Sequence, residues 1–168
     1  PEHHPALRRI MGRALITAFL TLLLVSCSGR TGKEIADAVR YGEELQAERL
    51  FSEAMEVYSD AEAKALKKGD QHSLGTIYRQ MARIYNATGN NADEIAYLDK
   101  AIEAFEAAGK PYNTLHVYFE SGVARYNTQD YASAEKMFRN TIFHAHQAAD
   151  TLLEAAGLEA YAALCLEK

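Results

Sequence analysis

One spacing constrains the fold of this chain more than any other feature: similar residues return every forty positions. Each unit has a small residue near its start and three further matching positions, which lie twelve, sixteen and nineteen residues after it. The matching positions are Gly42, Ala82, Gly122 and Ala162; Ala54, Glu94 and Ala134; Tyr58, Leu98 and Phe138; and Ala61, Ala101 and Thr141. A fixed period of this length predicts an array of similar structural units.

Within each unit the apolar residues follow the spacing of two amphipathic helices. In the second unit Tyr78, Met81 and Tyr85 stand three or four residues apart, and the same spacing returns between 95 and 105, so each segment carries one apolar stripe. Turn-forming residues at 88–91 separate the two segments. The expected helices cover residues 32–47, 51–68, 72–88, 91–108, 112–127, 131–148 and 152–167. Each unit is therefore predicted to be a helical hairpin.

The repeated small and large residues also predict how a hairpin packs. A glycine or alanine in the first helix lets the second helix approach closely, and a large side chain such as Tyr58 or Phe138 fills the space beside it. Gly69 and Gly109 suit left-handed residues at helix C-termini, and Pro111 suits the first turn of the following helix. The connectors are thus expected to repeat together with the helices.

Several runs resemble the tetratricopeptide repeat. MARIYNATG at 81–89 and IAYLDKAI at 95–102 resemble its two helices, and FSEAMEVYSDA at 51–61 and DYASAEKMF at 130–138 resemble its second helix. The unit here is 40 residues long, against about 34 in the common repeat. Two residues depart from the pattern: Glu94 stands where a small residue is expected, and Arg125 stands in place of a tyrosine.

The resemblance implies an all-α fold, a right-handed superhelix (α-solenoid) of antiparallel helical hairpins over residues 34–168. Its units would be three hairpins at about 34–70, 71–110 and 111–150, followed by the first helix of a fourth at 151–168. Because that helix would lack its partner, we expect the natural chain to continue into further repeats or domains.

The N-terminal thirty residues predict a targeting signal. Three arginines precede an uncharged apolar run at 14–25, whose length of roughly 18 Å as a helix is too short for a hydrocarbon core of about 30 Å. A basic segment followed by such a run is typical of a secretory signal. The run ends in Leu24-Val25-Ser26-Cys27, which resembles the lipobox of bacterial lipoproteins.

This second resemblance implies a signal peptide over 1–26, an acylated Cys27 that carries palmitate or similar chains, and a tether over 27–33. The mature protein would be anchored by lipid in the bacterial cell envelope, on the outer or inner membrane, and would face the periplasm.

Composition and spacing argue against other chemistry. Lys and Arg number 18 against 23 Asp and Glu, a formal net charge of −5, which disfavours nucleic acid as a partner. His144 and His146 point about 200° apart on a helix and cannot share a metal ion. Cys165 falls on the apolar face at the position of Leu45, which predicts a small core residue. No nucleophile or phosphate-loop pattern occurs, so we expect no catalytic residues, no metal and no cofactor.

The remaining candidate site is the concave surface that the first helix of each hairpin lines in the repeat family. The candidate binding residues on this face are Arg79, Arg83, Asn86, His116, Phe119, Tyr126 and Asn127. Arg79 and Arg83 lie one helical turn apart, so their guanidinium groups can converge on one carboxylate. Asn86 and Asn127 can hold a peptide backbone. The sequence therefore predicts a groove for a protein or peptide, although for any single residue a solvated helix face with no partner is the better explanation.

Two functional interpretations remain open at this stage. The first is a lipid-anchored scaffold without enzymatic activity that binds a protein or peptide. The second is the N-terminal sensory segment of a longer membrane-associated transcriptional or two-component regulator. A further apolar span of about 20 residues in the full-length chain would favour the second interpretation.

Overall fold

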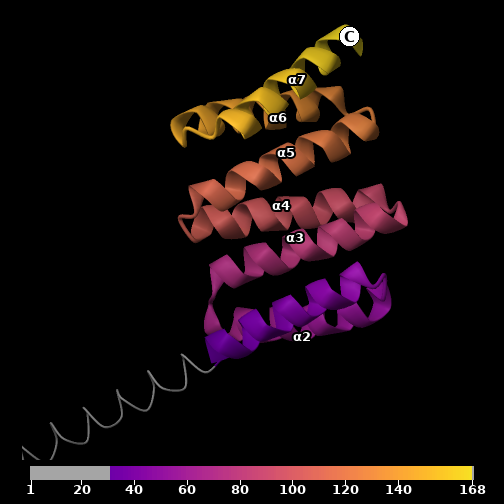
Figure 1. The fold of residues 1–168 in the computed structure, drawn as a ribbon, viewed down its shortest axis with the longest axis vertical. Coiled ribbons are helices and arrows are strands. Elements are labelled where there is room, and N and C mark those ends of the chain that lie inside the picture. The colour runs from indigo at the N-terminus through magenta and orange to yellow at the C-terminus, as the bar shows by residue number, and fades with distance from the viewer. Residues whose placement is uncertain (1–30, 168) are drawn as a thin grey trace, which may run out of the picture.

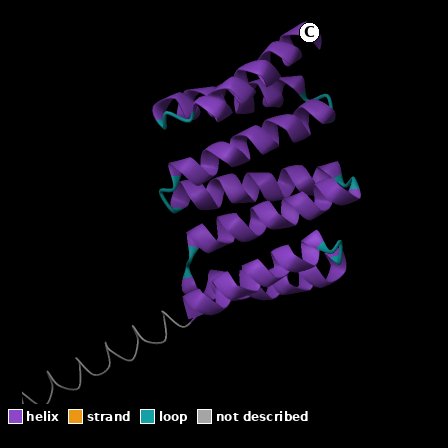
Figure 2. Ribbon diagram, in the orientation of Figure 1, coloured by secondary structure: helices purple, strands orange, loops and turns teal. Residues whose placement is uncertain are grey.

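The computed structural model describes residues 31–167, in which the expected helices end within one residue of their predicted bounds. They are the 31–47 helix, α2 (Phe51–Lys68), α3 (Gln71–Thr88), α4 (Asn91–Ala107), α5 (Pro111–Asn127), α6 (Tyr131–Gln147) and α7 (Thr151–Glu167). From α2 onward each packs against the next along the chain (Figure 1). Figure 2 shows only helices and short loops in this part of the chain. The predicted all-α repeat solenoid is confirmed.

The N-terminal segment falls mostly outside this description. Residues 31–33, which the sequence assigns to the tether, already belong to the first helix. The proposed signal peptide over 1–26 and the lipidation site Cys27 lie outside the described residues. Within residues 31–167 no helix has the length and apolar character needed to cross a membrane.

The turns repeat with the same forty-residue period as the helices. Residues with φ between 55° and 75° occur inside the hairpins at Arg49, Gly89 and Gln129, and between them at Gly69, Gly109 and Ala149. The left-handed conformation predicted for Gly69 and Gly109 is confirmed. The other positions show that the period holds even where a side chain is present, at a cost of about 1 kcal/mol per residue. The left-handed turn residue thus recurs at the same place in each unit whether or not it is glycine.

The close approach within each hairpin has the predicted cause. A Cβ atom built on Gly42 would lie 2.3 Å from Cε1 of Tyr58, and one on Gly122 would lie 2.5 Å from Cε1 of Phe138. Both rings are buried, so they occupy the space that the glycines leave open. The second hairpin reaches the same fit with Ala82 and the smaller Leu98.

A second pair of positions, forty residues apart from one hairpin to the next, also matches a small residue with a large one. The sequence analysis did not identify this pair. A Cβ on Gly75 would lie 2.7 Å from the ring of Phe105. The other hairpins place the large residue on the first helix and the small one on the second. These buried pairs are Ile35 with Ala65 and Leu115 with Ala145. Each hairpin thus keeps about the same summed side-chain volume at this pair of positions, although the helix that carries the large residue differs.

The packing of α7 differs from expectation at one residue. Leu153, Gly157 and Leu164 bury one face of α7, whereas Leu158 is 50% exposed. Cys165 is exposed, so its assignment to the core is wrong within the described chain. The reason is that no described helix packs on that side of α7, whereas α2 and α3 pack beside Leu45.

Candidate binding groove

Two cavities lie side by side on the face formed by the first helices of the hairpins, and both are lined by Arg83. The N-terminal cavity, of about 370 Å³, lies between the 31–47 helix and α3. The second, of about 290 Å³, lies between α3 and α5 with α4 at its floor; we call it the α3–α5 cavity. Together with Arg83 between them, these two cavities form what we call the groove.

Arg79 and Arg83 do converge on one carboxylate, and it belongs to the chain itself. Nε and Nη2 of Arg79 donate to Oε2 and Oε1 of Glu120 at 2.9 and 2.7 Å, and Nη2 of Arg83 donates to Oε1 at 3.0 Å. Burial acts to raise the pKa of Glu120, but the hydrogen bonds and charges of the two arginines outweigh it and hold that pKa below its ordinary value. This cluster ties α3 of one hairpin to α5 of the next.

The two arginines differ in how far they remain available to a ligand. The side chain of Arg79 is 24% exposed and makes both of the forked bonds, whereas that of Arg83 is 46% exposed and makes one. Arg79 therefore holds Glu120 in place and is less accessible to a ligand. Arg83 keeps donors free to reach a bound chain.

Glu94 forms part of the floor of the α3–α5 cavity. Its side chain accepts a hydrogen bond at Oε1 from Nδ2 of Asn86, at 2.9 Å, and only 7% of the residue is exposed. Burial raises the pKa of Glu94; the hydrogen bond from Asn86 opposes this, and the negative charge of Glu120 adds to it. The equivalent residues in the other hairpins, Ala54 and Ala134, are completely buried alanines.

The structure brings some of the predicted binding residues together and separates others. Arg83, Asn86 and Phe119 line the α3–α5 cavity, and Arg79 reaches it through Glu120. The remaining three line neither cavity of the groove. The ring of His116 packs edge-on against that of Tyr112, with 5.1 Å between the ring centroids, and the rings of Tyr126 and Tyr131 lie 5.7 Å apart in the same measure. Asn127 is exposed at the end of α5.

Sequence reasoning missed three residues that matter in the groove. Glu120 and Leu98 gave no signal as site residues, because one looked like a solvated carboxylate and the other like an ordinary core residue. Glu94 did give a signal, since it breaks the forty-residue pattern at a position that is otherwise small. In the N-terminal cavity Nε2 of Gln80 donates a hydrogen bond to Oε1 of Glu43.

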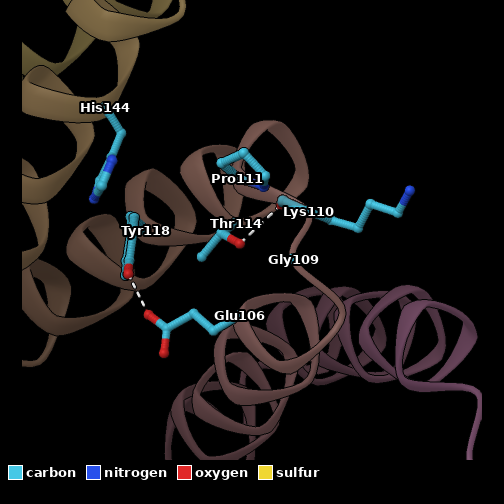
Figure 3. A pocket seen from close by; sticks show the side chains of 7 residues that line it. All are labelled: Glu106, Gly109, Lys110, Pro111, Thr114, Tyr118 and His144. Atoms are coloured by element: carbon cyan, nitrogen blue, oxygen red, sulfur yellow. Dashed lines mark hydrogen bonds between the residues drawn. The ribbon is translucent and has the colours of Figure 1, made fainter.

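A separate cavity of about 290 Å³ lies where α4 meets α5, near the end of α6 (Figure 3). Tyr118 donates a hydrogen bond to Glu106, and its ring stacks on that of His144 at 5.7 Å. Burial raises the pKa of Tyr118, and the bond to Glu106 and the charge of that carboxylate raise it further. Lys110 points away from these side chains in Figure 3. In this cavity Tyr118 is thus paired with Glu106, and the hydroxyl of Thr114 donates to the backbone carbonyl of Lys110.

Among residues 31–167, no three His, Cys, Asp or Glu side chains come together as a metal ion would require. No protein-family model matches the sequence, and no curated protein shows significant similarity to it.

Proposed function

We propose that this chain is a tetratricopeptide-like binding module without enzymatic activity, which holds an extended segment of a partner protein or a peptide in its groove. The observation that carries the proposal is the pair of adjacent cavities that share Arg83. Neighbouring cavities of side-chain size suit alternate side chains of an extended chain, because these point to the same face. The exposed guanidinium between them suits its backbone carbonyl groups.

The two cavities offer different chemistry to such a chain. The N-terminal cavity presents the polar side chains of Glu43, Gln46 and Gln80. The α3–α5 cavity has apolar walls, including Leu98 and Phe119, above the buried Glu94. Apolar area with a few placed polar groups is typical of sites that bind and orient a ligand.

Replacing Arg83 with alanine is expected to weaken peptide binding about tenfold or more, because a central arginine is a common binding hot spot. Peptides would be selected from a random dodecapeptide display library on immobilised protein, and their affinities measured by fluorescence anisotropy. Arg40→Ala is the matched control, since Arg40 is exposed, pairs only with Asp37 and lines neither cavity. Failure to select any peptide, or equal affinity for wild type and Arg83→Ala, would reject the groove.

We also propose that the module is tethered to a membrane of the bacterial cell envelope, facing the periplasm, through acyl chains on Cys27. The support is the lipobox at 24–27 after a basic and apolar leader, and two or more chains anchor far more firmly than one. Expressed in a bacterium that processes lipoproteins, the chain should incorporate labelled palmitate, and Cys27→Ser should abolish the label. Cys165→Ser, the matched control, should keep it; label that persists in Cys27→Ser contradicts the anchor.

A further inference from the structure

We propose that the α3–α5 cavity receives a lysine side chain of the bound segment, with its ammonium group against the carboxylate of Glu94. This inference rests on the proposed peptide-binding function and names the chemistry of the partner. Three observations carry it: an acidic residue where the repeat otherwise has alanine, the lack of a cation paired with that acid, and the apolar walls above it.

The first observation is the broken repeat. In the first and third hairpins the position of Glu94 holds Ala54 and Ala134, each with no exposed surface. A buried carboxylate is far more costly than an alanine at the same place unless it is paired. A local departure from an otherwise consistent pattern is expected at a functional site, where binding outweighs the loss of stability.

The second observation concerns the partners of Glu94. Asn86 donates to Oε1, and no ion pair joins Glu94 to a cation within residues 31–167. The two arginines nearby, Arg79 and Arg83, are paired with Glu120. Every fully buried side-chain oxygen or nitrogen in this part of the chain has a partner. Oε2 of Glu94, which accepts no hydrogen bond, is therefore not fully buried, and Glu94 lines the cavity.

The charge around this oxygen favours a cation. Arg83 and Glu120 line the cavity together with Glu94 and are paired with each other, and the negative charge of Glu120 disfavours ionisation of Glu94. An incoming ammonium would stabilise the carboxylate that burial and Glu120 both destabilise. The carboxylate of an acidic partner residue would be repelled at the same point.

The shape of the cavity favours lysine over arginine. Leu98, Phe119 and Val123 supply apolar surface along which a four-carbon stem can lie. One oxygen of Glu94 is already occupied by Asn86, so the forked pairing that arginine prefers is blocked. A compact ammonium needs only the free oxygen of Glu94 and the amide oxygen of Asn86.

The test is a peptide selection on wild type and on Glu94→Ala. Peptides selected on wild type should carry lysine at one fixed position. Replacing that lysine with norleucine, which keeps the stem and removes the ammonium, should weaken binding to wild type about ten- to hundredfold. The same replacement should change binding to Glu94→Ala or Glu94→Gln less than about threefold. Glu103→Ala, an exposed acid on the same helix, should behave as wild type.

Folding of the variants can be checked independently. Because alanine occupies this position in the two other hairpins, Glu94→Ala should melt no lower than wild type. Glu94→Gln keeps the shape of the side chain and removes only its charge. Selected peptides that need Arg83 but show no lysine preference, or a lysine preference that survives in Glu94→Gln, would overturn the lysine site and leave the groove standing. No selectable peptide at all would overturn both.

Discussion

Replacing Gly122 with alanine should destabilise the array by about 2 kcal/mol. The new Cβ would lie 2.5 and 2.6 Å from Cε1 and Cδ1 of Phe138, a residue that is only 1% exposed. Helix propensity alone would favour alanine over glycine by about 1 kcal/mol. The sign of the effect, measured by urea denaturation followed by circular dichroism, therefore separates packing from propensity.

The second hairpin supplies the compensating change for this variant. It fits Ala82 against Leu98, so Gly122→Ala combined with Phe138→Leu reproduces a combination the array already uses. Phe138→Leu alone should cost about 1–2 kcal/mol because it leaves a cavity beside Gly122. The double variant should lose less free energy of unfolding than the two single variants lose together, by at least about 1 kcal/mol. Additive losses would show that these positions do not set the spacing of the two helices.

Replacing Glu120 with alanine should cost about 2 kcal/mol, the second large effect. The change removes three charge-assisted hydrogen bonds and leaves Arg79, which is three-quarters buried, without a counter-charge. Asp37→Ala is the matched control, because Asp37 forms an exposed pair with Arg40 on one helix and should cost at most about 0.5 kcal/mol. Equal losses of unfolding free energy in Glu120→Ala and Asp37→Ala would show that the cluster of Arg79, Arg83 and Glu120 does not join the hairpins.

The contribution of Glu120 should depend on pH in a defined direction. Its pKa in the folded state is held below the ordinary 4.5 by the two arginines. The stabilisation is therefore complete above the unfolded pKa and is lost as the pH falls from there through the folded pKa. The difference in unfolding free energy between wild type and Glu120→Ala should persist at pH 7 and shrink below about pH 4.

Most of the fold followed from the sequence, whereas the site followed only in part. The helices lie where the period and the turn residues placed them, and Gly42 and Gly122 meet the aromatic rings predicted for them. Arg83, Asn86 and Phe119 were correctly placed on one face, and they line one cavity. The carboxylate that Arg79 and Arg83 share was expected to come from a partner, but Glu120 supplies it.

Glu94 illustrates why the remainder could not be predicted. Its departure from the repeat was visible in the sequence, but an acid in the first turn of a helix is favourable on its own account. The structure alone shows that this acid is buried, that Asn86 binds one of its oxygens and that the residue lines a cavity. The role of Glu94 thus depends on α3, the neighbouring helix that carries Asn86.

The sequence by itself determined the period, the helices, the turns and the matching of small with large residues inside each hairpin. These features are local: they join residues that lie close along the chain, so spacing and volume suffice to specify them. The tertiary structure alone decided which residues of successive hairpins meet, such as Arg79 with Glu120, and where cavities form between them. That outcome depends on the shift and rotation from one hairpin to the next, which result from packing the whole stack and which no local pattern encodes.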